Sequence, residues 1–240
     1  MEEHGYDVRY LLSQPLPRHH LAADYAEALL ATHPVLDDVR AVLAFCMAAP
    51  LAQEVAARIS CPLLVFFDGE PSSPEAIRCE FRQIQRSLAG GPVAMPSWWS
   101  QELVTQRSDA LLRAIEDELR RTLLAAVSGD PFDEDDLSLD EPAAGPDDAA
   151  FPLISAYLDW LAHLVASYHS DYPAWGGDVV NLVSRQQPVV DPWPGAASTR
   201  TVRMQSDRAS MLAHGETRGL VLDILGARKP PAHHLMEGTG

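Results

Sequence analysis

Basic residues are scarce in this chain of 240 residues, where 18 lysines and arginines stand against 34 aspartates and glutamates, a formal net charge of −16. A protein that binds nucleic acid needs a basic face for the phosphates, so this balance argues against DNA or RNA as a partner. Long apolar runs are missing as well. No stretch of about 18 apolar residues occurs, which excludes a membrane-spanning helix.

The chain also lacks a secretion signal and a disulfide framework. Its first four residues, MEEH, have neither the positive start nor the apolar stretch of a signal peptide. Three cysteines (Cys46, Cys61 and Cys79) in a chain of this length fit a reducing compartment. We therefore expect a soluble, globular, cytoplasmic protein.

Metal-ligand patterns are missing too. The adjacent pairs His19-His20 and His233-His234 have side chains that diverge in an extended chain, and no third donor follows at metal-ligand spacing. We expect neither a metal nor a cofactor.

Strand-like and helix-like segments alternate along the chain, which predicts an α/β fold with a mostly parallel sheet flanked by helices. Short β-rich runs predict strands, and apolar residues at three- and four-residue spacing predict helices. The predicted strands are 8–12, 39–45, 63–67, 179–183 and 201–204, and the predicted helices are 21–30, 51–58, 108–126, 151–168 and 211–225.

The acidic residues are unevenly placed. The stretch 130–148 holds nine of them, no basic residue and three prolines, which predicts a solvated loop. A docking surface for a basic partner is the alternative. We expect a single domain over residues 1–226 with a helical lid at about 97–172, which includes an acidic loop at 129–150. A loose tail is expected at 227–240.

Cys46 follows a predicted strand and precedes a predicted helix. This is the slot of a nucleophile elbow, in which a reactive side chain sits on a sharp turn and the next backbone amide helps to form an oxyanion hole. Small flanking residues are needed there, and Ala44 and Ala48 are small although they are not glycine. A cysteine after a buried strand can equally be a small core residue.

The neighbouring sequence carries a resemblance. Residues 42–58 (VLAFCMAAPLAQEVAAR) are similar to the elbow and following helix of the thioesterases of polyketide synthases and nonribosomal peptide synthetases. Residues 62–71 (PLLVFFDGEP) resemble the family's next strand, and 206–212 (SDRASML) resemble its late G-D-H-F-S-M-L segment. The similarity extends over most of residues 6–226 and implies an α/β-hydrolase fold with a lid.

Carried over residue by residue, the resemblance places the family's nucleophile on Cys46, its triad acid on Asp68 and its base on Arg208. The oxyanion amide falls on Met47. A thiol suits acyl transfer. A guanidinium remains protonated and cannot accept the thiol proton, so Arg208 would instead act by its charge, bind an anionic substrate group or pair with Asp68.

Other features depart from the family pattern. The family's first strands and the loop with its second oxyanion amide are expected to be absent, because only 45 residues precede Cys46. A homodimer or a partner chain would then cover the bare sheet edge. Whether His163 or His169, both in the lid segment, reaches Cys46 stays open at this stage.

Aromatic residues of the predicted lid are candidates for contact with an acyl chain, although aromatics at helical spacing are also typical of a core. The candidates are Trp98, Trp99, Tyr157 and Trp160. The resemblance implies a thioesterase-like protein that handles an acyl thioester on a carrier protein, by hydrolysis or transfer through Cys46. The alternative is a pseudo-thioesterase without hydrolytic activity, which binds a small-molecule intermediate, assists a noncovalent cyclisation or isomerisation, or acts as a partner subunit.

Overall fold

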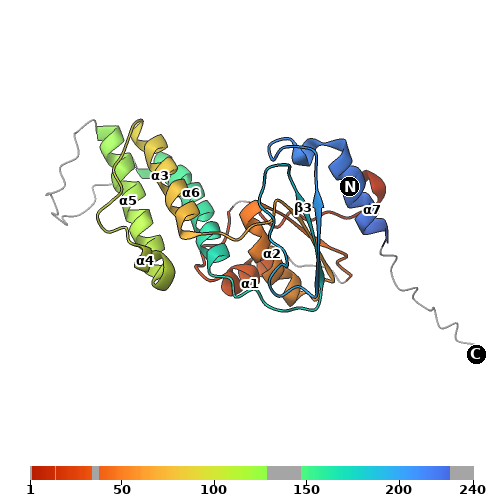
Figure 1. The fold of residues 1–240 in the computed structure, drawn as a ribbon. Coiled ribbons are helices and arrows are strands. Elements are labelled where there is room, and N and C mark those ends of the chain that lie inside the picture. Colours follow the sequence, from red (N-terminus) through yellow and green to blue (C-terminus); the bar gives the residue numbers. More distant parts are fainter. Residues whose placement is uncertain (1, 14, 34–37, 129–146, 228–240) are drawn as a thin grey trace, which may run out of the picture.

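The computed structural model describes residues 2–13, 15–33, 38–128 and 147–227. Its centre is a four-stranded sheet in the order β1-β2-β3-β4, and all three neighbouring pairs are parallel. The strands are β1 (Val42–Phe45), β2 (Leu63–Phe67), β3 (Asp178–Val183) and β4 (Ser198–Arg203). Helices flank this sheet (Figure 1), so the predicted α/β fold class is confirmed.

Helices occupy most of the remaining described chain. Short 3-10 turns cover Glu2–His4, Cys46–Ala48 and Met211–Ala213. The α-helices are α1 (Ala22–Thr32), α2 (Ala49–Arg58), α3 (Pro74–Ala89), α4 (Gln101–Gln106), α5 (Ser108–Ser128), α6 (Asp147–Tyr168) and α7 (Gly215–Ala227).

The sequence of β2, LLVFF, explains why the sheet is covered on both faces. Successive side chains of a strand point to opposite faces. Leu63, Val65 and Phe67 pack in one apolar cluster with residues of α7, whereas Leu64 and Phe66 pack in another with residues of α2. Every residue of this strand is buried. An uninterrupted apolar run is therefore what a central parallel strand requires.

The remaining helices form a separate unit beyond α1 and α2 (Figure 1). Helices α3, α4, α5 and α6 share one apolar cluster, in which Ile77, Phe81, Leu111 and Leu161 are fully buried. Helix α6 also contacts α1, α2 and the 3-10 turn that begins at Cys46. The helical unit therefore contacts the sheet and its flanking helices next to the candidate nucleophile, through α6.

Three predictions of secondary structure were wrong. Residues 8–12 form no strand; Tyr10 and Leu12 are 75% and 48% exposed there. β-rich composition alone forms no strand where no neighbouring strand supplies hydrogen bonds. The predicted helix 211–225 is broken at His214 and runs on to Ala227. Residues 147–150 belong to α6 rather than to a loop, while the rest of the predicted acidic loop and most of the tail lie outside the described residues.

Two other properties bear on the expectations from sequence. Within the described ranges, no helix is long and apolar enough to cross a bilayer. In the same part of the chain, β1 is an edge strand and no strand precedes it.

Candidate functional site

Cys46 lies where β1 turns into α2, and its backbone is in the left-handed region with φ of 58°. A residue with a side chain rarely adopts this conformation, which costs on the order of 1–3 kcal/mol. Such strain at a strand–helix junction is typical of a nucleophile elbow. The carbonyl of Cys46 accepts a hydrogen bond from the Glu70 backbone N–H (3.3 Å), so the ends of β1 and β2 are joined.

The segment after β2 is held in a fixed position by Asn181, a fully buried residue of β3. Its side-chain oxygen accepts from the Gly69 N–H at 3.1 Å, and its amide nitrogen donates to the Gly69 carbonyl at 3.4 Å. A Cβ on Gly69 would lie only 2.7 Å from the Phe66 Cβ. Glycine is therefore required at position 69. The hydrogen bonds of Asn181 to Gly69 also hold the next residue, Glu70, in position.

Three side chains meet at the elbow. The Cys46 thiol donates to Glu70 Oε1 at 3.0 Å. Nη2 of Arg208 donates to the same carboxylate oxygen at 2.7 Å and also contacts the Cys46 sulfur. The Arg208 guanidinium lies over the Phe45 ring, 5.6 Å from its centroid. A thiol, a carboxylate and a cation thus share one site at the sheet's carboxyl edge.

A glutamine completes this cluster. Gln187 Nε2 donates to Glu70 Oε2 at 2.6 Å, and Gln187 Oε1 accepts from Arg208 Nη1 at 3.2 Å. Cys46, Glu70, Gln187 and Arg208 follow β1, β2, β3 and β4 respectively. The carboxyl ends of parallel strands meet at one edge, which is where α/β proteins build their sites. We call these four residues the strand-end cluster.

Asp68 lies beside the strand-end cluster but bonds elsewhere. It is fully buried, its Oδ1 accepts from the Ser184 backbone N–H at 2.6 Å, and its Oδ2 has no hydrogen-bond partner among the described residues. Its backbone is also left-handed, with φ of 50°. The ion pair of Arg208 is made with Glu70 and not with Asp68.

The electrostatics of the site keep the thiol protonated. Burial, together with the hydrogen bond and charge of Glu70, raises the pKa of Cys46 to about 11. A hydrogen bond from the Met47 backbone and the charge of Arg208 act in the opposite direction but are weaker. For Arg208, burial lowers the pKa, but the hydrogen bond to Glu70 and the charges of Cys46, Glu70 and Asp68 outweigh it and leave the pKa raised.

His163 of α6 and His169, just after that helix, make other contacts. His163 is buried, lies 3.3 Å from the Tyr25 hydroxyl through Nδ1, and stacks on Trp160. Burial lowers its pKa to about 4. His169 is the residue after α6, and its Nε2 pairs with the Val104 carbonyl at 2.9 Å.

The aromatic candidates from the sequence lie in the helical unit. Trp98 and Trp99 pack against Phe81, and Trp98 also donates to Glu118 at 3.3 Å. Tyr157 packs against the same apolar cluster, as does Met47 of the elbow, and Trp160 is 37% exposed beside His163.

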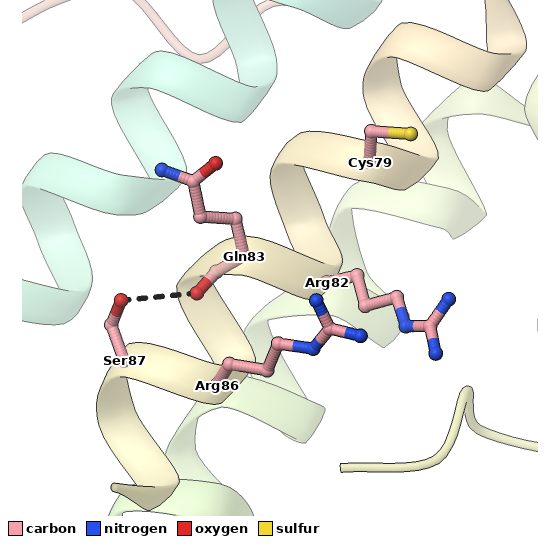
Figure 2. Close-up of a pocket in the computed structure, with 5 residues that line it drawn as sticks. All are labelled: Cys79, Arg82, Gln83, Arg86 and Ser87. Atoms are coloured by element: carbon pink, nitrogen blue, oxygen red, sulfur yellow. Dashed lines mark hydrogen bonds between the residues drawn. The ribbon is translucent and has the colours of Figure 1, made fainter. Parts of the chain in front are cut away.

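A shallow depression of about 450 Å³ lies on α3 and includes no residue of the strand-end cluster (Figure 2). It is lined by Cys79, Arg82, Gln83, Arg86 and Ser87. In Figure 2 the two arginine side chains project from the same side of the helix. Within the described part of the chain, no group of three or more His, Cys, Asp or Glu side chains has a metal-binding arrangement.

Sequence reasoning missed Glu70 and Gln187. Glu70 stands two residues after Asp68, in the loop that follows a predicted strand, so the strand-end rule alone points to it. Gln187 has no comparable signal, because it follows β3 by four residues in an irregular loop.

No protein-family model and no curated protein matches this sequence. Among solved structures, the chain is similar to the RedJ thioesterase from the prodiginine biosynthetic pathway of Streptomyces coelicolor, with 17% identity, coverage of 88% of this chain and 72% of that one, and a TM-score of 0.41. It is also similar to the thioesterase domain that cyclises the lipopeptide antibiotic surfactin, with 15% identity, 87% and 76% coverage, and a TM-score of 0.39.

An enol-lactonase from Burkholderia xenovorans is similar too, with 12% identity, 90% and 76% coverage, and a TM-score of 0.47. These three neighbours are two thioesterases and an enol-lactonase. With TM-scores below 0.5, they decide nothing about the chemistry of the strand-end cluster, which depends on this chain's own side chains.

Proposed function

We propose that this chain handles an acyl thioester carried by a carrier protein and accepts the acyl group on Cys46. The acyl group is then released to water or to another acceptor. A polyketide or nonribosomal peptide pathway is the setting that the sequence resemblance implies, and the cysteine content favours the cytoplasm. The carrier with its tethered substrate is the partner in this proposal.

The left-handed backbone of Cys46 carries the proposal. Strain of this kind persists only where the surrounding structure enforces it. Here the strained residue carries a thiol that contacts Glu70 and Arg208 at the end of β1. A core cysteine needs no such turn. Cys46 is partly exposed and its sulfur contacts Glu70 and Arg208, whereas a core cysteine is surrounded by apolar groups.

The transfer exchanges one thioester for another. The Cys46 sulfur attacks the thioester carbonyl carbon, and the Cys46 proton leaves the sulfur as the new C–S bond forms. The carbonyl oxygen becomes negative, with the Met47 N–H as the proposed donor to it. When the C–S bond to the carrier breaks, the carrier sulfur takes up a proton, which balances the one that Cys46 lost, and leaves as a thiol. Hydrolysis then adds water across the Cys46 thioester, releases a carboxylic acid and restores the thiol.

Other residues have supporting roles in this proposal. Arg208 stabilises negative charge near the sulfur, and Asp68 orients the loop that follows β3 through Ser184. The helical unit acts as the lid, and Trp98, Trp99, Tyr157 and Trp160 contact the acyl chain where they are exposed. Among the described residues β1 has a neighbouring strand on one side only, and a second copy or a partner chain would add at its other edge.

A noncovalent function is the second candidate, and the pKa of Cys46 favours it. A thiol with a pKa of about 11 is almost wholly protonated at neutral pH, so its nucleophilicity is low. In that case the scaffold binds a pathway intermediate, with Arg208 as the partner of an anionic group, and assists its cyclisation or isomerisation without an acyl-enzyme.

Intact-mass analysis after incubation with short and long acyl-N-acetylcysteamine thioesters separates these candidates. We expect an acyl adduct on the wild type, none on Cys46→Ala, and an unchanged adduct on Cys79→Ala, which removes an exposed thiol on α3. A lack of adduct with every acyl group would contradict covalent transfer. Ligand binding would then be measured on the wild type and on Arg208→Gln.

A further inference from the structure

We infer that Glu70 is the group that accepts the proton of Cys46, at the position where a histidine base would otherwise be needed. This inference rests on the proposed function. It assigns a catalytic role to a residue that neither the sequence resemblance nor the comparisons point to.

The contact between the two side chains supports direct proton transfer. The Cys46 sulfur lies 3.0 Å from Glu70 Oε1, within the reach that a general base requires. The Glu70 side chain is 28% exposed and that of Arg208 is 39% exposed. Cys46 itself is partly exposed, and in this proposal a substrate carbonyl approaches its sulfur from solvent while the carboxylate stays in contact with it.

Glu70 is held in place from four directions. Its backbone N–H bonds to the Cys46 carbonyl, and the residue before it is bound by Asn181. Its two carboxylate oxygens accept from Arg208 and from Gln187. A carboxylate whose main chain and both oxygens are fixed does not need to reorganise when the thiol reacts.

The other polar groups near the elbow do not suit this role. Arg208 is a cation and has no lone pair to accept a proton. Asp68 accepts from the Ser184 N–H through one carboxylate oxygen, and among the described residues neither of its oxygens bonds to Cys46. His163 pairs with Tyr25, and His169 pairs with the Val104 carbonyl.

Glu70 takes up the Cys46 proton and later gives it to the departing sulfur. As the Cys46 sulfur bonds to the carbonyl carbon, the S–H proton passes to Glu70 Oε1, and the carboxylate becomes a neutral acid. When the carrier sulfur departs with its bonding electrons, Glu70 returns the proton to it. In hydrolysis, Glu70 takes a proton from the attacking water and delivers it to the Cys46 sulfur. No further reactant is required.

Arg208 and Gln187 support this step differently. Nη2 of Arg208 reaches both the sulfur and Glu70 Oε1, so its charge offsets the negative charge that moves between them. Gln187 bridges Glu70 Oε2 and Arg208 Nη1 and is a positioning residue, because it does not touch the reacting sulfur.

The test compares two reactions of Cys46 in wild type and Glu70→Gln, with Glu75→Gln on α3 as the matched control. The first is alkylation by iodoacetamide, followed at Cys46 by peptide mass spectrometry. The second is acylation by an acyl-N-acetylcysteamine thioester. Burial, together with the hydrogen bond and charge of Glu70, raises the pKa of Cys46. Removal of the Glu70 charge should lower that pKa, so Glu70→Gln should alkylate faster at neutral pH, about tenfold for each unit by which the pKa falls.

Acylation should change in the opposite direction. Loss of a general base slows a reaction about 10²–10⁴-fold, so Glu70→Gln should acylate more slowly although its thiol alkylates faster. Glu70→Asp, which keeps a carboxylate on a shorter side chain, should acylate at an intermediate rate. Glu75→Gln should match the wild type in both reactions.

Three other results would contradict either the role of Glu70 or the proposed function. If Glu70→Gln acylates as fast as the wild type or faster, Glu70 acts only through its charge and is not the proton acceptor. If Glu70→Gln slows both reactions and Glu70→Asp does the same, the residue has a structural role only. If the wild type forms no acyl adduct, the proposed function fails, which is a different outcome from either of these.

Discussion

Ser167 of α6 donates a hydrogen bond from its hydroxyl to the backbone carbonyl of Met47, at 2.5 Å. Both residues lie at the contact between the helical unit and the elbow, and the Ser167 side chain is buried. The bond joins a helix of the proposed lid to the turn that carries the candidate nucleophile, over 120 residues of sequence.

Ser167→Ala should therefore destabilise the protein. The substitution leaves the Met47 carbonyl without this partner, which lowers the free energy of unfolding by about 1–3 kcal/mol. Urea unfolding followed by circular dichroism measures the change. Ser87→Ala is the control, because that exposed hydroxyl bonds only to a carbonyl within its own helix. Equal stability of Ser167→Ala and wild type would show that the helix does not depend on this bond.

Removal of the cation should lower the reactivity of Cys46. Arg208 lowers the pKa of the thiol, so Arg208→Gln should raise that pKa and slow iodoacetamide alkylation at neutral pH by about tenfold per pKa unit. The pH dependence of alkylation measures this effect at the Cys46 peptide. Arg113→Gln, which removes an exposed arginine paired with Asp109, should leave the profile unchanged. Faster alkylation of Arg208→Gln would contradict the prediction.

The buried imidazole of His163 should contribute to acid sensitivity. Burial lowers its pKa from 6.5 to about 4, so the folded state binds its proton less readily than the unfolded chain. This contribution to stability is complete above pH 6.5 and is lost as the pH falls towards 4, to the extent of about 3 kcal/mol.

His163→Phe tests this linkage while it retains a ring between Tyr25 and Trp160. The free energy of unfolding should fall less between pH 7 and pH 4 in this variant than in the wild type, as measured by urea titrations at each pH. His19→Gln, at an exposed position, should follow the wild-type dependence. Identical slopes for His163→Phe and wild type would exclude His163 as the titrating group.

Gly69→Ala should disturb both stability and the site. Its Cβ would meet the Phe66 Cβ at 2.7 Å, so either the strand end or the loop that carries Glu70 has to shift. Overpacking of this kind lowers the free energy of unfolding by about 1–3 kcal/mol. Alkylation of Cys46 should also change, since its contact with Glu70 is displaced. Gly91→Ala, whose Cβ meets nothing within 4 Å, should be neutral in both measurements.

Most of the sheet could be predicted from local sequence. The run Leu63–Phe67 is apolar throughout, which is typical of a parallel strand that is buried on both faces. β2 was therefore predicted with its correct ends. The run at 8–12 has similar residue types but forms no strand, because a strand also needs hydrogen-bonding partners that its own sequence does not supply.

The sequence by itself determined the α/β class, the central strands and the position of Cys46 between a strand and a helix, because apolar periodicity and turn chemistry act over a few residues. Tertiary structure alone decided which carboxylate meets the thiol. Asp68 and Glu70 are two residues apart, but only Glu70 bonds to Cys46. The left-handed backbone at Asp68 and the hydrogen bonds between Asn181 and Gly69 set this arrangement. Gln187 and Arg208 join them because the carboxyl ends of all four parallel strands lie at one edge, an arrangement of residues up to 162 positions apart that no local pattern encodes.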